Sequence, residues 1–313
     1  MILYKYLSPE VGLKVLRNQS VRFTQPGALN DPFEASPQVE SAIQPGHEEG
    51  LADYLIEKFE EENDLENLQN WILDQGYDEL IDSANEMDVP DNYMELLEEL
   101  WPLLHDEMFS DENIKETLRK GFKEERDNPS LVPDFQETLD PYIGLFCLTE
   151  TPSNKLMWSH YAVGHRGIVI GLKADHSFFL NEEATDERFR RPQKVQYVSE
   201  QPAYPGLSDS PEEDMQDWMI DNLIFKKDAS WKYEEEWRHV HYLGNADEIL
   251  NEDQEYPICL FSFPADLVES VILGAKVEPE YSEKVSELLS KNEYTHTSLK
   301  EAQLKDFSVQ IPD

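Results

Sequence analysis

The sequence has few cysteines and no long apolar run, and both features limit where the protein acts. Only two cysteines occur, Cys147 and Cys259, and both lie inside short apolar runs typical of buried strands. Two buried thiols indicate a reducing compartment. No apolar run approaches the roughly 18 residues of a membrane span, and residues 1–6 lack a signal-peptide pattern. We therefore expect a cytoplasmic protein with no membrane partner.

Basic residues are also scarce. The chain of 313 residues has 26 Lys and Arg against 66 Asp and Glu, a formal net charge of −40. A field of this sign repels phosphate backbones, so broad nucleic-acid binding is not expected. We interpret the acidity as adaptation to salt or as a means of solubility. Mimicry of a nucleic acid is the alternative, but the basic residues Arg188, Arg190 and Arg191 interrupt the acidic sequence.

Several signatures of catalysis are missing as well. The sequence has no Gly-rich phosphate loop, no Gly-x-Ser-x-Gly elbow and no Cys near a His along the chain. Closely set metal ligands are lacking, because His160 and His165 are five residues apart and His239 and His241 form an ordinary strand pair. We predict no metal cofactor.

The sequence does contain enough apolar residues, in strand-like and helical patterns, to form a folded core. Hydrophobic residues make up 39% and aromatic residues 11%, so the chain is not of the disordered type. The pattern predicts an α+β fold with a central, mostly antiparallel sheet. Strands are expected at residues 2–6, 20–24, 143–148, 166–172, 194–198, 237–242, 257–262 and 268–273, with a final pair at 293–298 and 305–309. Helices are expected at residues 8–18 and 278–290.

An acidic stretch interrupts this pattern. Residues 38–140 show apolar side chains at helical spacing, as in Leu51, Leu55 and Ile56, or Leu65, Leu68, Trp71 and Ile72. We predict a helical insertion of about four helices at 38–140 within a single α+β domain formed by residues 1–37 and 141–313. A solvated cover is the simplest interpretation, and a substrate lid or a partner-binding surface is the alternative.

Two segments carry most of the candidate chemistry. The first, Met157-Trp158-Ser159-His160-Tyr161, is predicted as a short helix that holds His160 at the wall of a cleft, or else buries it as a core residue. Arg166 follows at the mouth of a strand, where it either binds an anion or pairs with a structural acid.

The second segment, Phe225 to Arg238, mixes aromatic, basic and acidic residues just before a strand. Strand alternation places Glu236 and Arg238 on one face. The two side chains either neutralise each other or present an acid and a guanidinium fork to a ligand.

These segments resemble a bacterial family called domain of unknown function 2971, over residues 3 to about 275. The resemblance rests on five patterns: Leu3-Tyr4-Lys5-Tyr6, Asn30-Asp31-Pro32-Phe33-Glu34, Cys147-Leu148-Thr149, Met157 to Ala162 with His165-Arg166-Gly167, and Trp231-x-Tyr233-x-x-Glu236-Trp237-Arg238. It implies positions for a site but no reaction, and it does not explain the acidic insertion.

The opening strand, helix and strand, with a late Glu, are also similar to the layout of ADP-ribosyltransferases, which cleave the nicotinamide bond of NAD. In that scheme Tyr4 or Lys5 contacts the adenosine ribose, Tyr161 or Trp231 stacks on nicotinamide, and Glu236 steadies the developing positive charge. The chain departs from that superfamily in having Lys5 where His or Arg is usual, and in lacking a Ser-Thr-Ser-type strand.

The expected function is thus that of an ADP-ribosyltransferase-like protein that uses NAD as substrate, in defence or stress response, with a small nucleotide or a protein target as partner. Two alternatives stay open: a non-catalytic protein that senses a nucleotide or peptide, and a small-nucleotide hydrolase with His160 and Glu236 as base and acid and Arg166 and Arg238 on phosphate. The candidate catalytic residues are Glu236, His160 and Tyr161. The candidate ligand-binding residues are Tyr4, Lys5, Tyr6, Asn30, Asp31, Trp158, Ser159, Arg166, Lys227, Trp231 and Arg238.

Overall fold

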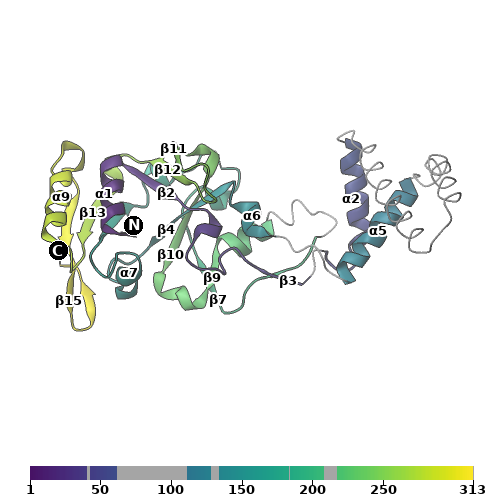
Figure 1. The fold of residues 1–313 in the computed structure, drawn as a ribbon, viewed down its shortest axis with the longest axis horizontal. Coiled ribbons are helices and arrows are strands. Elements are labelled where there is room, and N and C mark those ends of the chain that lie inside the picture. Colours follow the sequence, from purple (N-terminus) through teal and green to yellow (C-terminus); the bar gives the residue numbers. More distant parts are fainter. Residues whose placement is uncertain (41–42, 62–110, 128–133, 183, 208–216, 313) are drawn as a thin grey trace, which may run out of the picture. The chain divides into compact units, whose positions relative to one another are not determined.

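The computed structural model describes residues 1–40, 43–61, 111–127, 134–182, 184–207 and 217–312 (Figure 1). The chain divides into two compact units, of which the first consists of Met1–Pro37, Asp134–Pro202 and Ile220–Asp313. The second consists of Gln38–Pro133 and Ala203–Met219. The second unit is therefore made of two separate segments, and the sequence pattern indicates only the first of them.

A seven-stranded sheet forms the centre of the first unit. Its neighbouring strands are antiparallel, except β13 and β14, which are parallel. This arrangement confirms the predicted α+β class with a mostly antiparallel central sheet. The order across the sheet is β14 (Ser298–Glu301), β13 (Val268–Leu273), β5 (Ile168–Lys173), β1 (Ile2–Leu7), β4 (Ile143–Thr149), β10 (Glu236–Tyr242) and β6 (Gln193–Lys194).

The other described strands form four smaller sheets. The sets that pair with one another are β11 (Glu248–Leu250), β12 (Ile258–Ser262) and β2 (Ser20–Phe23); β15 (Gln303–Lys305) and β16 (Ser308–Gln310); β7 (Gln196–Val198) and β9 (Lys226–Asp228); and β3 (Gln38–Val39) and β8 (Ala203–Tyr204). The last pair belongs to the second unit and joins its two segments in parallel.

The described α-helices range from five to 17 residues in length. The α-helices are α1 (Pro9–Asn18), α2 (Glu48–Glu61), α5 (Asp111–Asp127), α6 (Phe135–Leu139), α7 (Lys155–His160) and α9 (Pro279–Leu289). Short segments of 3-10 or π-helix are η1 (Pro26–Ala28), η2 (Ser177–Phe179), η3 (Glu187–Phe189), η4 (Ile220–Ile224), η5 (Ala229–Glu234), η6 (Leu243–Asn245), η7 (Ala265–Leu267) and η8 (Asn292–Tyr294).

The opening β1, α1 and β2 follow from local signals. The Val11 amide donates to Ser8 Oγ at 3.3 Å, and Pro9 occupies the first turn, where its missing N–H costs nothing. Gln19, in the left-handed region at φ 49°, ends the helix and turns the chain into β2. The helix buries Val15 and Leu16, each worth roughly 1.5–3 kcal/mol by the area removed from water.

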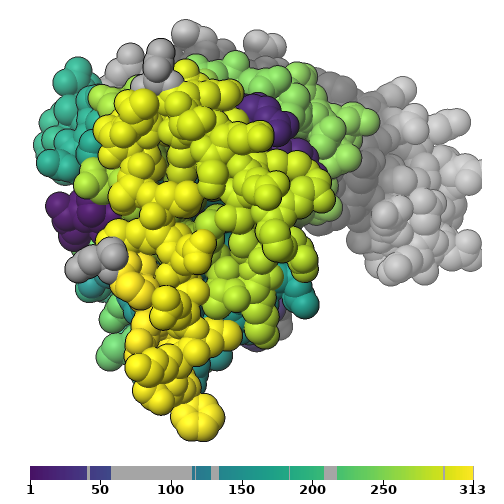
Figure 2. Space-filling view, turned by 90° about the vertical axis from the view of Figure 1, so that its left-hand side faces the viewer, coloured from purple at the N-terminus to yellow at the C-terminus, as the bar shows by residue number. Residues whose placement is uncertain are grey.

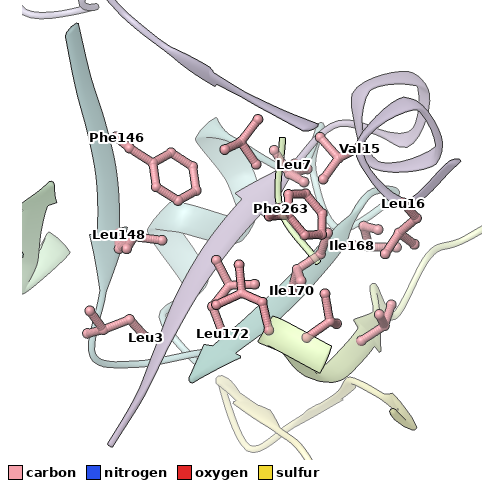
Figure 3. Close-up of a cluster of buried hydrophobic side chains, with 14 of the residues drawn as sticks. Leu3, Leu7, Val15, Leu16, Phe146, Leu148, Ile168, Ile170, Leu172 and Phe263 are labelled. Carbon is pink, nitrogen blue, oxygen red and sulfur yellow. The ribbon is translucent and has the colours of Figure 1, made fainter. Parts of the chain in front are cut away.

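Strand alternation gives the two faces of the sheet different contents. Figure 3 shows Leu3 and Leu7 of β1 gathered with Leu148 of β4 and Ile170 of β5 in the main hydrophobic core. Tyr6 instead packs in a separate cluster with Met157 and Trp158 of α7, with Tyr4 and Tyr161 against it. The aromatic side chains of β1 are thus directed away from the main core.

The C-terminal residues cover one side of the first unit, where Figure 2 shows them in yellow. The predicted final strand pair is wrong in detail. Residues 292–294 form a helical turn, β14 begins only at Ser298, and the hairpin consists of β15 and β16 around Asp306 and Phe307.

The described helices of the second unit are α2 and α5. They are joined by an ion pair between Lys115 and Asp53 (2.5 Å), and Leu51 is buried with Ile43 against Phe122. The predicted helical pattern at Leu65, Leu68, Trp71 and Ile72 lies outside the described residues. In the part of the chain that the structure describes, no helix is sufficiently long and apolar to cross a membrane.

Three consecutive left-handed residues join α7 to β5: Val163 (φ 49°), Gly164 (φ 62°) and His165 (φ 70°). For a β-branched residue this backbone costs roughly 1–2 kcal/mol, whereas glycine adopts it freely. We expect Val163→Gly to raise the free energy of unfolding by about 1 kcal/mol, measured by urea denaturation.

Val11→Gly is the matched control, because Val11 is similarly exposed but lies in α1. There the same substitution lowers stability, since glycine weakens a helix. Equal losses in both variants would show that the left-handed turn stores no strain at Val163.

Candidate functional site

The central sheet forks at β4. Near its end β4 pairs with β1, where Thr149 lies opposite Tyr4, and this is the one position at which the two strands are paired. Towards its start β4 pairs instead with the end of β2: the Thr24 amide donates to the Leu145 carbonyl at 3.0 Å, and the Leu145 amide donates back at 2.8 Å. Between these points, β4 exchanges β1 for β2 as its neighbour.

A lysine crosses this fork. Lys5 Nζ donates to the Cys147 carbonyl at 2.8 Å and lies 5.3 Å from the Phe146 ring centroid. It thereby satisfies a β4 carbonyl where a strand would otherwise pair.

A cavity of about 100 Å³ lies at this fork, and we call it the fork cavity. Its walls combine aromatic side chains from β1 and α7 with charged side chains from β9, η5 and β10. The lining residues are Tyr4, Lys5, Tyr6, Thr24, Leu29, Asn30, Leu145, Cys147, Leu148, Met157, Tyr161, Lys227, Glu234 and Glu236.

Behind one wall lies a buried charge cluster, which we define as Glu34, Lys227, Glu234, Glu236 and Arg238. Lys227 Nζ contacts three carboxylates, at 2.8 Å from Glu236 Oε2, 2.9 Å from Glu234 Oε2 and 3.7 Å from Glu34 Oε2. Arg238 Nε donates to Glu236 Oε1 at 2.7 Å, and its other nitrogens donate to Glu34 Oε1 and the Ile224 carbonyl. Three carboxyl groups therefore face two cations.

Burial and charge pull the pKa values of the cluster in different directions. Burial would raise the pKa of Glu236, but Arg238 and Lys227 outweigh it and lower this pKa to about 2. For Glu34, burial raises the pKa, and the attraction of Arg238 and Lys227 offsets this only in part. Burial would lower the pKa of Lys227, yet Glu236 and Glu34 hold it above its usual value. Glu236 is thus a permanent anion at the cavity, and of these two carboxyl groups Glu34 protonates more readily.

Tyr161 connects the cluster to the cavity mouth. Its hydroxyl donates to Glu234 Oε1 at 2.6 Å and accepts from Asn30 Nδ2 at 3.1 Å. Burial and the neighbouring Glu234 raise the pKa of Tyr161, so the phenol stays protonated and continues to donate.

The segment that ends η5 places Glu234 and Glu236, two positions apart, against Lys227. Asp228 caps η5 by accepting from the Ser230 amide at 2.8 Å, and η5 is followed by Glu235, which adopts the left-handed region at φ 46°. Glu234 and Glu236 lie on either side of Glu235, and both are buried while Glu235 is exposed, which is the order that a period of two gives. The ring centroid of Trp231, on η5, lies 5.1 Å from Lys227 Nζ and supports the ammonium from outside the cavity.

A buried cluster of this kind is a poor means of stabilising a fold. Desolvating several charges costs as much as their pairing returns, and apolar residues of similar volume would often stabilise the core more. Such a cluster at the wall of a cavity instead points to a functional site.

The structure brings together about half of the residues that the sequence singles out. Those lining the fork cavity are Tyr4, Lys5, Tyr6, Asn30, Tyr161, Lys227 and Glu236, and Arg238 lies in the charge cluster behind them. The shared face predicted for Glu236 and Arg238 agrees with their bond. Trp231 touches Lys227 but does not line the cavity.

The remaining candidate residues from the sequence lie outside the fork cavity. His160, Ser159 and Arg166 are exposed and do not line the fork cavity, because α7 ends at His160 and Arg166 precedes β5. The predicted placement of His160 at a cleft wall is not what the structure has.

Trp158 and Asp31 are buried and hold local structure. The indole nitrogen of Trp158 donates to the Pro152 carbonyl at 2.8 Å, and Asp31 Oδ1 accepts from the Phe33 amide at 3.0 Å. Each side chain is thus occupied by its own loop.

Sequence reasoning missed two members of the cluster, Glu34 and Glu234. Glu34 closes the Asn30-Asp31-Pro32-Phe33-Glu34 pattern, and it is a single acid after a turn with no basic neighbour nearby in sequence. Glu234 begins a run of three glutamates, which reads as a solvated surface. The signal for Glu34 lies in the resemblance pattern, whereas Glu234 is a variable position of its pattern and is indicated by its spacing of two residues from Glu236.

Other chemistries find less support at the cavity. Burial raises the pKa of Cys147 to about 12, so its thiol is not a nucleophile at neutral pH. Among the described residues, no group of three or more His, Cys, Asp or Glu side chains is arranged to hold a metal ion. A larger cavity of about 640 Å³ lies near α6 and β12 and includes Asp134, Asp140 and Glu255, but none of the charge cluster.

Comparison with known proteins supports the family resemblance. A family model described as "Protein of unknown function (DUF2971)" matches residues 157–239, a range that begins in α7 and ends in β10. The match supports the predicted family resemblance over this range, which includes Tyr161, Lys227, Glu234, Glu236 and Arg238. Comparison with curated proteins and with solved structures gave no match.

Proposed function

We propose that this chain, which matches the DUF2971 family of proteins of unknown function over residues 157–239, binds the nicotinamide end of NAD in the fork cavity and transfers its ADP-ribosyl group. The observation that carries the proposal is the union of Tyr4, Tyr161 and Glu236 in one cavity. The size of that cavity, about 100 Å³, is below the roughly 300–1,000 Å³ of sites for whole drug-sized ligands, so it suits one ring rather than an entire dinucleotide.

The chemistry uses the fixed charge of the wall. In the reaction, the bond between the nicotinamide nitrogen and ribose C1′ breaks, and its electron pair leaves with neutral nicotinamide. An acceptor then bonds to C1′ and loses a proton. Positive charge develops on the ribose in between, and the anions of Glu236 and Glu234 are already oriented by Lys227, Arg238 and Tyr161 to stabilise it.

Free nicotinamide is the readout that tests this proposal. We expect the wild type to release nicotinamide from NAD in the presence of cell extract, and Glu236→Gln to lose at least about 100-fold of that rate, as removal of a main electrostatic group does. Glu280→Gln, a matched change of an exposed residue in α9, should leave the rate unaltered.

Thermal denaturation of each variant separates a loss of chemistry from a loss of fold. If the wild type neither releases nicotinamide nor is stabilised by NAD, the proposal fails. Equal release by wild type and Glu236→Gln would also exclude it.

One observation favours a second candidate, a non-catalytic protein that senses a nucleotide. Both carboxylate oxygens of Glu236 already accept hydrogen bonds from the protein, Oε1 from Arg238 and Oε2 from Lys227. A carboxylate so held does not move a proton. Stabilisation of wild type and Glu236→Gln by NAD to the same extent, without turnover in either, is the result that selects this candidate.

A further inference from the structure

A second cavity of about 250 Å³ shares a wall residue with the fork cavity. Lys227 lines both, and the segment from Asn30 to Ser36 contributes to both as well: Asn30 to the fork cavity, and Phe33, Ala35 and Ser36 to the second. Nothing in the proposed transfer step uses this second cavity.

The loop at the second cavity presents an aromatic ring. Phe33 is 67% exposed, whereas the next residue, Glu34, is 3% exposed and belongs to the charge cluster. The next residue, Ala35, adopts the left-handed region at φ 52°, so the chain turns directly after Glu34. A large exposed aromatic ring at the wall of a cavity offers a face on which another flat ring can stack.

The other walls fit a nucleoside. Val198, Pro202 and Leu223 supply apolar surface, and Lys226 and Asn222, whose side chains are hydrogen-bonded at 2.7 Å, supply polar groups. Glu200 is an exposed carboxylate at the same cavity. Acidic residues in dinucleotide sites accept hydrogen bonds from ribose hydroxyls, which is the role this position suits.

The two volumes are complementary. The fork cavity accommodates a single ring, and the second cavity is larger by more than a factor of two. Each cavity alone is smaller than the roughly 300–1,000 Å³ typical of sites for larger ligands, so each suits one part of such a ligand. A ligand with a ring at one end and a nucleoside at the other matches this pair of cavities.

We propose that the second cavity binds an adenine nucleoside, stacked on Phe33, and thereby holds the adenosine end of NAD while nicotinamide occupies the fork cavity. This inference rests on the proposed use of NAD, but adenosine alone is sufficient to test it.

The experiment is calorimetric titration of adenosine into the full chain. We expect binding to the wild type, weakened about ten-fold in Phe33→Ala, since stacking of a base on an aromatic side chain is worth roughly 1–3 kcal/mol. Phe307→Ala is the matched control, because Phe307 is 99% exposed on the β15–β16 hairpin and lines neither cavity. It should bind adenosine as the wild type does. Phe33 is an exposed side chain, so its truncation should leave thermal stability unaltered.

The outcomes separate this inference from the proposed function. Adenosine binding that is absent, or equal in wild type and Phe33→Ala, overturns the second cavity as a nucleoside site even if nicotinamide is released. Adenosine binding that depends on Phe33, in a protein that releases no nicotinamide, supports the site and removes the transferase.

Discussion

Arg238→Leu should lower the free energy of unfolding by about 3–5 kcal/mol, which is the usual cost of removing one partner from a buried ion pair. The side chain of Arg238 is fully buried and contacts Glu34, Glu236 and the Ile224 carbonyl. Its loss leaves two buried carboxylates with Lys227 as their remaining cation within the charge cluster. Urea denaturation at pH 7 measures the change.

Two further variants test the cause. Arg190→Leu removes a more exposed guanidinium, paired with Glu187 at 3.2 Å, and should cost less than about 1 kcal/mol. Arg238→Leu combined with Glu236→Gln should recover part of the loss, because one unpaired charge is then neutralised. Losses that are equal for Arg238 and Arg190 would contradict a buried charge cluster.

Acid should destabilise the protein through His239. This side chain is fully buried in β10, and burial, with the neighbouring His241, lowers its pKa from 6.5 to about 3. The folded state therefore binds fewer protons than the unfolded state, so stability is lost as the pH falls below about 6.5 and continues to fall to about 3. At 1.36 kcal/mol per pH unit, the loss from this residue is about 2 kcal/mol by pH 5.

The control is His239→Phe, which keeps a ring beside Phe23, Phe178 and Phe179 but cannot titrate. Between pH 7 and pH 5, the free energy of unfolding of this variant should fall by about 2 kcal/mol less than that of the wild type. Glu236 contributes only below about pH 4.5, because its folded pKa is lowered to about 2, so the two effects occupy different pH ranges. Parallel pH profiles for wild type and His239→Phe would exclude His239 as the cause.

The local elements of the fold were predictable because their signals are local. Ser8 and Pro9 indicate the start of α1, and the apolar runs at β4, β5 and β13 are long enough to identify buried strands. The hairpin around Asp306 and Phe307 was placed wrongly because both residues adopt positive φ, at 51° and 58°, without the Asn or Gly that usually indicates such a turn.

The site was harder to predict because it depends on distant pairings. Tyr4 and Glu236 meet only because both lie opposite Thr149 in the sheet. Glu34 and Arg238, which bond each other, are 204 positions apart. Alternation correctly places Glu236 beside Arg238, and the same spacing of two extends to Glu234, but alternation within this segment cannot identify Glu34 as a partner of Arg238.

The two-segment composition of the second unit has a consequence for how this protein can be shortened. β3 and β8 pair with each other although one precedes residues 43–133 and the other begins at Ala203. Excising residues 38–133 alone would leave Ala203 and Tyr204 without their partner strand, and excising 203–219 alone would do the same to Gln38 and Val39. A trimmed protein that keeps the sheet and the fork therefore requires two coordinated deletions.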